Sequence, residues 1–248
     1  MKTTTIILLS FMILLTNCTK DSASAASQSS GAGGSTARFT IVGNYLYVVN
    51  NTNLKAFDIT DPAAAPVLKS TTDVGINIET IFPYQDKLFI GSSFSMHIFS
   101  LANPAKPSRV AEAQYMIRMS CDPVVAKDST AYATLNSTGP CGGGGSQLVV
   151  YDIKDITSPQ LRGSVPLTGP YGLGISDSAL YVCDGSYGLK VFNIRNTYSP
   201  QLLRTINGDT FYDVIPYGNM LICQVSGGLV LYDISTRHLP VFLSRISN

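Results

Sequence analysis

The residue types that most often carry out chemistry are sparse in this sequence of 248 residues. The two histidines, His97 and His238, occupy non-equivalent positions of a sequence repeat, so a shared site is not expected. No Ser-His-Asp arrangement and no Gly-x-Ser-x-Gly nucleophile motif is indicated. Asp58, Asp152 and Asp233 recur at one repeat position, where a ring of metal ligands could form. We expect them to cap turns instead, because Asp side chains accept hydrogen bonds from nearby turn N–H groups.

A second group of candidates is acidic, amidic or aromatic and lies near the starts of the predicted innermost strands. Its members are Asn77, Glu79, Asp122, Tyr171, Asp209, Tyr212 and Asp213. In a fold with a central channel, the loops at one end converge on that channel, and ligand sites are usually concave. We therefore predict a channel rim that could bind a cation or a polyol. The alternative is an ordinary solvated rim of loop residues.

The cysteines show no metal-ligand spacing, since no Cys-x-x-Cys occurs, and we predict neither a metal nor a cofactor. Cys121 precedes the innermost strand of the third repeat, and Cys141 lies in an insertion between its second and third strands. These positions fall at the same end of one unit, so we predict a disulfide closing a loop of about twenty residues, worth about 3 kcal/mol. Cys183 and Cys223 each lie in a second strand and are predicted to be buried free thiols.

The elements that must position these residues form a repeat with two anchors. The first anchor is Phe57-Asp58-Ile59, Phe99-Ser100-Leu101, Tyr151-Asp152-Ile153, Phe192-Asn193-Ile194 and Tyr232-Asp233-Ile234. The second is Leu46-Tyr47-Val48, Leu88-Phe89-Ile90, Ala131-Tyr132-Ala133, Leu180-Tyr181-Val182 and Met220-Leu221-Ile222. Two independent anchors that share a period of about 42 residues indicate a repeat architecture with five units.

Each unit contains four short apolar runs separated by turn signals. In the fourth unit they cover 172–176, 180–183, 189–194 and 201–206. Four strands in about 40–45 residues are typical of a propeller blade. We therefore predict an all-β fold, a five-bladed β-propeller of four-stranded blades, with a β-sandwich as the alternative. Each blade should be contiguous in sequence, and blade 1 should pack on blade 5 without sharing a strand.

Residues 180–184 (Leu-Tyr-Val-Cys-Asp), 188–194 (Gly-Leu-Lys-Val-Phe-Asn-Ile) and Ser199-Pro200 resemble the LVIVD repeat family. The resemblance spans about 38 to 246, and it is clearest in the fourth and fifth units. This family comprises extracytoplasmic bacterial propeller proteins. The resemblance therefore implies the propeller fold and an exported location, and it supplies no catalytic residues.

The first residues are predicted to be a targeting segment. The apolar run 6–15 would rise only about 15 Å as a helix, half the thickness of a bilayer core, which favours a secretory signal over a membrane span. Leu15-Thr16-Asn17-Cys18 resembles the lipobox of bacterial lipoproteins, which implies lipidation of Cys18. We thus predict a signal peptide over 1–17, the lipidated Cys18 with a Ser/Ala/Gly-rich flexible linker over 18–37, and the propeller over 38–248.

Composition narrows the choice of function. Charged residues make up 13% of the chain and the net charge is +1, so no basic stripe is available for nucleic acid. Thr19 follows the predicted lipidation site, and Lys20-Asp21 directly after it resembles the surface-export signals of some Bacteroidetes lipoproteins. We expect a non-catalytic module, lipid-anchored at the outer membrane or cell surface, that binds or scaffolds a protein or a glycan. The alternative is a propeller enzyme, a hydrolase or lyase, acting at the central channel.

Overall fold

The computed structural model describes residues 34–115, 123–137 and 145–248, and in these ranges the chain is all-β. The predicted Cys18, Cys121, Cys141 and Asp122 fall outside the described residues. The strands are β1 (Phe39–Val42), β2 (Tyr45–Val49), β3 (Asn53–Asp58), β4 (Val67–Asp73), β5 (Ile78–Tyr84), β6 (Lys87–Ser92), β7 (Ser95–Ser100), β8 (Ser108–Gln114), β9 (Val124–Lys127), β10 (Thr130–Leu135), β11 (Gln147–Asp152), β12 (Gln160–Pro166), β13 (Leu173–Ser176), β14 (Ala179–Cys183), β15 (Leu189–Asn193), β16 (Gln201–Ile206), β17 (Phe211–Tyr217), β18 (Met220–Val225), β19 (Gly228–Asp233) and β20 (Val241–Ser247). Within these ranges no helix is long and apolar enough to cross a bilayer.

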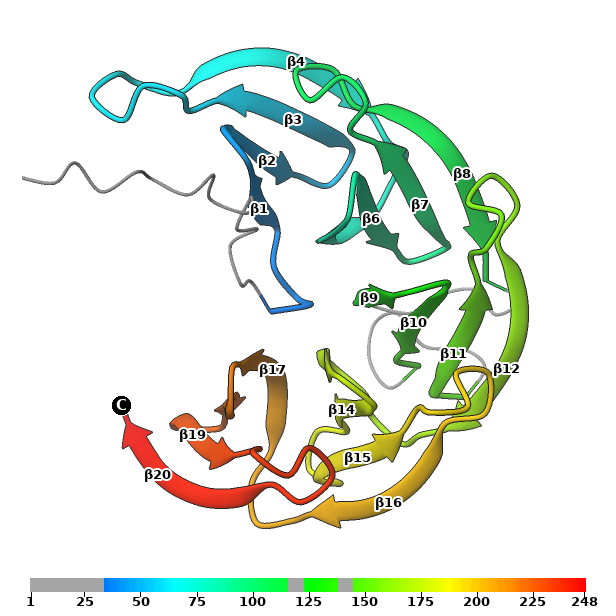
Figure 1. Cartoon of the computed structure of the whole chain (residues 1–248), viewed down its shortest axis with the longest axis vertical. Coiled ribbons are helices and arrows are strands. Elements are labelled where there is room, and N and C mark those ends of the chain that lie inside the picture. Colours follow the sequence, from blue (N-terminus) through cyan, green and yellow to red (C-terminus); the bar gives the residue numbers. More distant parts are fainter. Residues whose placement is uncertain (1–33, 116–122, 138–144) are drawn as a thin grey trace, which may run out of the picture.

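The strands form five four-stranded antiparallel sheets, each from four consecutive strands. Blade 1 is β1–β4, blade 2 is β5–β8, blade 3 is β9–β12, blade 4 is β13–β16 and blade 5 is β17–β20 (Figure 1). The first strand of each blade lies innermost and the fourth lies outermost. The prediction of five contiguous four-stranded blades is therefore confirmed.

The aromatic residue of the first anchor marks the same irregularity in every blade. The register between third and fourth strands shifts just before Phe57, Phe99, Tyr151, Phe192 and Tyr232. A bulge bends a strand and increases its twist. Five equivalent bulges therefore explain how each outermost strand curves around the outside of its blade.

Four apolar layers lie between neighbouring blades. Because of these layers, strands of the blades inside the arc are buried on both faces. Tyrosines of the second strands reinforce three of these layers by donating hydrogen bonds to carbonyls of the next blade. Tyr47 Oη lies 2.9 Å from the Pro104 carbonyl, and Tyr181 Oη lies 2.6 Å from that of Arg237. Tyr132 makes the equivalent bond to Thr197 at 2.9 Å. Each fully buried phenol is thus satisfied by the neighbouring repeat.

The predicted alignment of the second anchor is one residue out of register in blade 5. In blades 1, 2 and 4 the first leucine of the second anchor pairs with the aromatic residue of the first, as Leu180 does with Phe192. In blade 5 the partner of Tyr232 is Leu221 rather than Met220. The anchor of blade 5 therefore begins at Leu221, because only this register places the leucine on the face that packs against blade 4.

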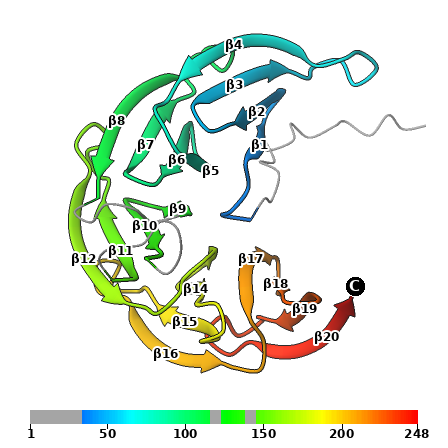
Figure 2. The same cartoon turned by 180° about the vertical axis from the view of Figure 1, so that it is seen from behind.

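The predicted packing of blade 1 on blade 5 is wrong for this structure. Figures 1 and 2 show the blades along an arc whose two ends do not meet. Contacts join the innermost strands of successive blades from β1 to β5, β9, β13 and β17, and no comparable contact joins β17 to β1 among the described residues. Phe39 in blade 1 is 60% exposed, and Leu229 in blade 5 is 36% exposed. The two end faces are consequently apolar, and no described residue of the opposite end covers them.

Candidate functional site

The recurring acidic position is structural, as predicted. Asp58 Oδ1 accepts a hydrogen bond from the Thr60 N–H at 2.9 Å, and Asp233 Oδ1 accepts one from the Ser235 N–H at 2.7 Å. The side chains of Ser100, Asp152 and Asn193 make the same bond to the N–H group two residues ahead. All five cap the turn into the outermost strand, so the position accepts Ser and Asn as well as Asp. No group of three or more potential metal ligands occurs within the described ranges.

Three of the predicted rim residues come together at the channel end of blades 4 and 5. The rings of Tyr171 and Tyr212 meet edge to face with centroids 5.5 Å apart. The Gly172 N–H donates to the Tyr212 carbonyl at 2.8 Å, which joins the two blades beside Asp213. A Cβ on Gly172 would overlap the Asp213 carboxylate, so the close approach of the blades requires glycine there.

Asp213 is buried and already engaged by the segment that precedes blade 1. Thr36 Oγ1 donates to its carboxylate at 2.6 Å, and Ser35 Oγ lies 3.3 Å from the other oxygen. Ser35 Oγ also accepts the Leu173 N–H at 2.7 Å. Burial raises the pKa of Asp213, while these hydrogen bonds oppose the shift. This side chain therefore fixes the start of the domain to blades 4 and 5 instead of facing an open rim.

The other described rim residues lie apart from this group. Glu79 Oε1 accepts a hydrogen bond from Ser93 Oγ at 3.2 Å, and Asn77 is exposed in the left-handed conformation with φ 55°. Asp209 forms a bidentate ion pair with Arg245 of β20 at 2.7 and 2.8 Å. The rim residues therefore do not converge on one open site, because several of their polar groups are already paired within the chain.

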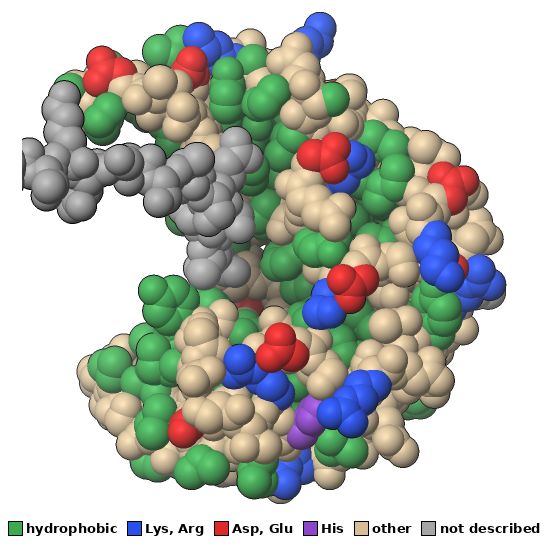
Figure 3. All heavy atoms as spheres, in the orientation of Figure 1, with side chains coloured by type: hydrophobic (Ala, Val, Ile, Leu, Met, Phe, Trp, Pro, Cys, Tyr) green, Lys and Arg blue, Asp and Glu red, His purple; other side chains and the backbone are tan. Residues whose placement is uncertain are grey.

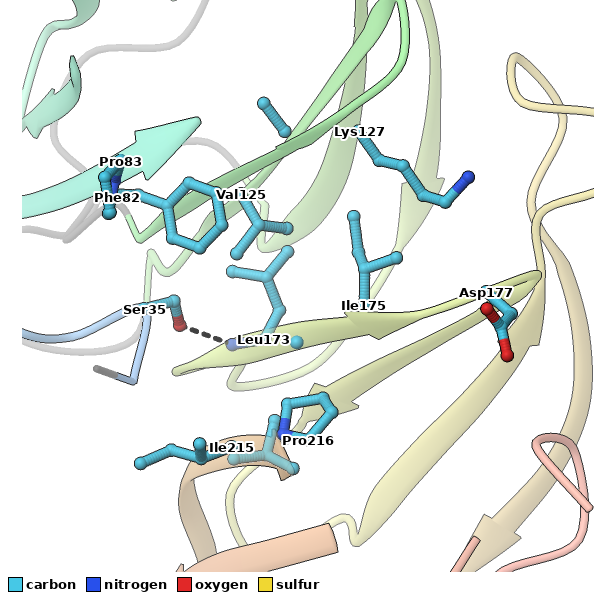
Figure 4. Close-up of a pocket in the computed structure, with 13 residues that line it drawn as sticks. Ser35, Phe82, Pro83, Val125, Lys127, Leu173, Ile175, Asp177, Ile215 and Pro216 are labelled. Atoms are coloured by element: carbon cyan, nitrogen blue, oxygen red, sulfur yellow. Dashed lines mark hydrogen bonds between the residues drawn. The ribbon is translucent and has the colours of Figure 1, made fainter. Parts of the chain in front are cut away.

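The open part of the channel is an apolar pocket of about 270 Å³ between four of the five innermost strands, β5, β9, β13 and β17. Figure 4 shows Phe82, Val125, Ile175 and Pro216 directed into it from these strands. Ser35 lies at one side, with its hydrogen bond to Leu173. The lining comes mainly from the middle and final residues of the innermost strands, whereas the predicted rim lies at their starts.

The two charged residues at this pocket are held by other partners. Lys127 Nζ lies 2.6 Å from Asp128, and Asp177 lies 2.6 Å from the Arg237 Nε. The Arg237 guanidinium lowers the pKa of Asp177 by hydrogen bonding and by its charge. The pocket therefore presents an apolar floor inside a rim of paired charges. On the face shown in Figure 3, the Lys and Arg side chains are scattered and do not gather in one basic patch.

Sequence reasoning missed this pocket, although a signal for it exists. Ile-Phe-Pro-Tyr at 81–84 and Val-Ile-Pro-Tyr at 214–217 place Pro83 and Pro216 at equivalent positions, paired with Leu88 and Leu221. Proline has no N–H to donate and is tolerated mainly on the edge strand of a sheet. A repeated proline in the first strand therefore indicates which edge lines the channel.

Together the radial blades, the innermost edge strands and the central pocket define a β-propeller. Residues 33–74 match the LVIVD repeat model, so blade 1 contains an LVIVD repeat. The match falls on the first unit, whereas the motif reads most clearly in the fourth and fifth. No match is found among curated proteins.

Solved structures support the same fold. A 6-phosphogluconolactonase-like protein from Bacteroides uniformis aligns with a TM-score of 0.67 and 13% identity, over 83% of this chain and 69% of that one. A functionally unknown protein from Desulfotomaculum acetoxidans aligns with a TM-score of 0.66 and 9% identity, over 83% and 67%. BamB from Moraxella catarrhalis aligns with a TM-score of 0.58 and 13% identity, over 76% and 54%. At these identities the similarity concerns the fold alone, and the chain spans between about half and about two thirds of these structures.

Proposed function

We propose that this protein is a lipid-anchored surface module whose propeller binds a partner protein at its central channel. The observation that carries the proposal is the apolar pocket between β5, β9, β13 and β17. Its size of about 270 Å³ is small for a drug-sized ligand, since such sites occupy about 300–1,000 Å³. It suits one or two apolar side chains of a partner, which would anchor an interface at a desolvated centre.

The chemistry of the lining favours a protein over a glycan at this position. A sugar requires several hydrogen-bonding groups, whereas Phe82, Val125, Ile175 and Pro216 offer none from their side chains. The paired charges of Lys127 and Asp177 at the rim are typical of the polar border around an apolar interface centre.

Photo-crosslinking of the anchored, full-length protein tests the binding site. A photoreactive residue at Ile175 should capture a discrete partner, and the product should disappear when Ile215→Asp is added to the pocket. The same probe at Leu243, which is 53% exposed on the outermost strand, provides the control. An identical pattern from both positions, or no product from Ile175, would contradict the proposal.

The membrane anchor is tested separately at Cys18. Cys18→Ser should abolish acyl labelling and shift the protein from the membrane fraction to the soluble fraction or to an unprocessed precursor. Surface location is then measured by protease accessibility of the domain in intact cells. Unchanged fractionation and unchanged acyl labelling of the variant would show that Cys18 is not the anchor.

A further inference from the structure

A second pocket, of about 360 Å³, lies away from the channel between the loop leaving blade 1 and the outer half of blade 2. Its lining is polar on several sides, unlike that of the channel. Asp73, Ser95, His97, Arg109 and Glu112 contribute polar groups, and Phe94 contributes an apolar surface. The size lies within the usual range for small-ligand sites, about 300–1,000 Å³.

His97 lines this pocket, and only one of its two ring nitrogens has a hydrogen-bond partner. The side chain is buried, and its Nε2 lies 3.1 Å from Ser95 Oγ. Its Nδ1 is buried without a hydrogen-bond partner, and the carboxylate of Glu112 is 3.7 Å away. Gly75 lies beside the ring with a φ of 135°, and a Cβ there would be 4.0 Å from the imidazole, in ordinary van der Waals contact.

The repeat itself does not require a histidine here. Counting back two residues from the anchor aromatic, the equivalent positions in the other blades are Lys55, Val149, Lys190 and Val230. Blades therefore pack with either an aliphatic or a lysine side chain at this position. A buried polar group without a partner is costly, which indicates that His97 serves something other than blade packing.

The Ser95–His97–Glu112 arrangement resembles a hydrolytic triad, but its chemistry is unsuited to one. Burial, together with the charge of Arg109, lowers the pKa of His97 to about 4, despite the opposing effect of Glu112. A general base works best with a pKa near the operating pH. Glu112 is also held by Arg109 at 3.1 Å, closer than it is to His97. The imidazole is thus a neutral hydrogen-bonding group rather than a proton acceptor.

We propose that this pocket binds a small, uncharged, hydroxyl-rich ligand, of which a single sugar unit is the representative. Two carboxylates, Asp73 and Glu112, disfavour an anion, while Arg109 disfavours a cation. Hydroxyl groups both donate and accept, so they match the carboxylates of Asp73 and Glu112 and the guanidinium of Arg109 together. The ring of Phe94 offers a surface for the C–H face of a sugar.

The test uses the full-length protein and a panel of D-glucose, D-mannose and mannitol, with binding measured by titration calorimetry and ligand-observed NMR. At least one of them should bind, and Glu112→Gln should weaken binding about tenfold or more, because a charge-assisted hydrogen bond is replaced by a weaker neutral one. Asp86→Asn, a surface acid on the same blade paired with Lys87, is the matched control and should leave binding unchanged. Asp73→Asn provides a second pocket variant, and thermal unfolding confirms that each variant is folded.

Several results would overturn the assignment. These are the absence of binding by the whole panel, equal weakening in the Asp86→Asn control, or preferred binding of inorganic phosphate or Ca²⁺. Labelling of Ser95 by a fluorophosphonate would also overturn the assignment, because it would identify the pocket as a hydrolase site. The ligand could be one unit of a glycan chain or a free metabolite, and a tetrasaccharide of the bound sugar distinguishes the two. A site for glycan chains should bind the tetrasaccharide at least as well as the free unit, whereas a metabolite site should exclude the tetrasaccharide. Ile215→Asp in the channel should leave sugar binding unchanged, so this proposal and the channel proposal fail separately.

Discussion

At the scale of single residues, one repeat position shows how a recurring acid can be mistaken for a ligand. The spacing of Asp58, Asp152 and Asp233 is compatible with a ring of metal ligands. However, Ser100 and Asn193 occupy the equivalent positions, and their side chains accept the same hydrogen bond from a turn N–H group. The shared property is a side-chain oxygen that accepts the N–H two residues ahead. The chemistry of the turn, rather than that of a metal, therefore explains the pattern.

The buried His97 gives a prediction on pH dependence. Its pKa of about 4 in the folded protein lies below the usual value of about 6.5, because burial disfavours the charged ring. The unfolded chain therefore binds a proton first as the pH falls, and folding loses stability between about pH 6.5 and pH 4. The loss should reach about 3 kcal/mol at 1.36 kcal/mol per pKa unit.

Urea unfolding at pH 7 and pH 4.5 checks this expectation in the wild type and in His97→Gln. Other groups titrate in the same range, so the quantity compared is the difference in stability loss between the two proteins. The wild type should lose about 2–3 kcal/mol more than the variant on acidification. Identical losses would show that the imidazole is protonated in the folded state.

At the scale of the strand, the register of blade 5 decides which side chains form its core. Leu221 is fully buried and packs with Cys223 against blade 4, whereas Met220 lies on the opposite face. Cys223 shares this apolar layer with Cys183, and both are free buried thiols, as predicted. Burial raises the pKa of both thiols, so neither is activated as a nucleophile.

This register predicts unequal costs for two neighbouring substitutions. Leu221→Ala should lower the free energy of unfolding by about 2–5 kcal/mol, because it leaves a cavity between blades 4 and 5. Met220→Ala should cost clearly less, because the side chain is only partly buried. Chemical denaturation of the two variants measures the difference. A larger cost at Met220 would restore the alignment expected from the sequence.

At the scale of the whole molecule, the open arc leaves each terminal blade with one face that no other blade covers within the described part of the chain. Leucines at equivalent positions of blades 1 and 4 allow the effect of the missing contact on stability to be measured. Leu180 is fully buried between blades 3 and 4, while the equivalent Leu46 of blade 1 is only half-buried. Leu180→Ala should therefore cost at least about 2 kcal/mol, and Leu46→Ala should cost markedly less. Equal costs in equilibrium unfolding would indicate that blades 1 and 5 close the ring in solution.

The sequence by itself determined the repeat, the five blades and the turn chemistry, because these depend on contacts within about 40 neighbouring residues. Strand periodicity, turn residues and the anchor aromatics are all local signals. The cap at Asp58 and the buried thiol of Cys183 could be predicted for the same reason.

Only the tertiary structure decided what the blades enclose. Asp213 was predicted at an open rim, but Ser35 and Thr36, more than 170 residues earlier in the chain, occupy its carboxylate. His97 likewise acquires its environment from the loop that leaves the preceding blade. Residues so distant in sequence meet because apolar faces stack blade on blade, and no local pattern records how far that stacking curves or whether the arc closes.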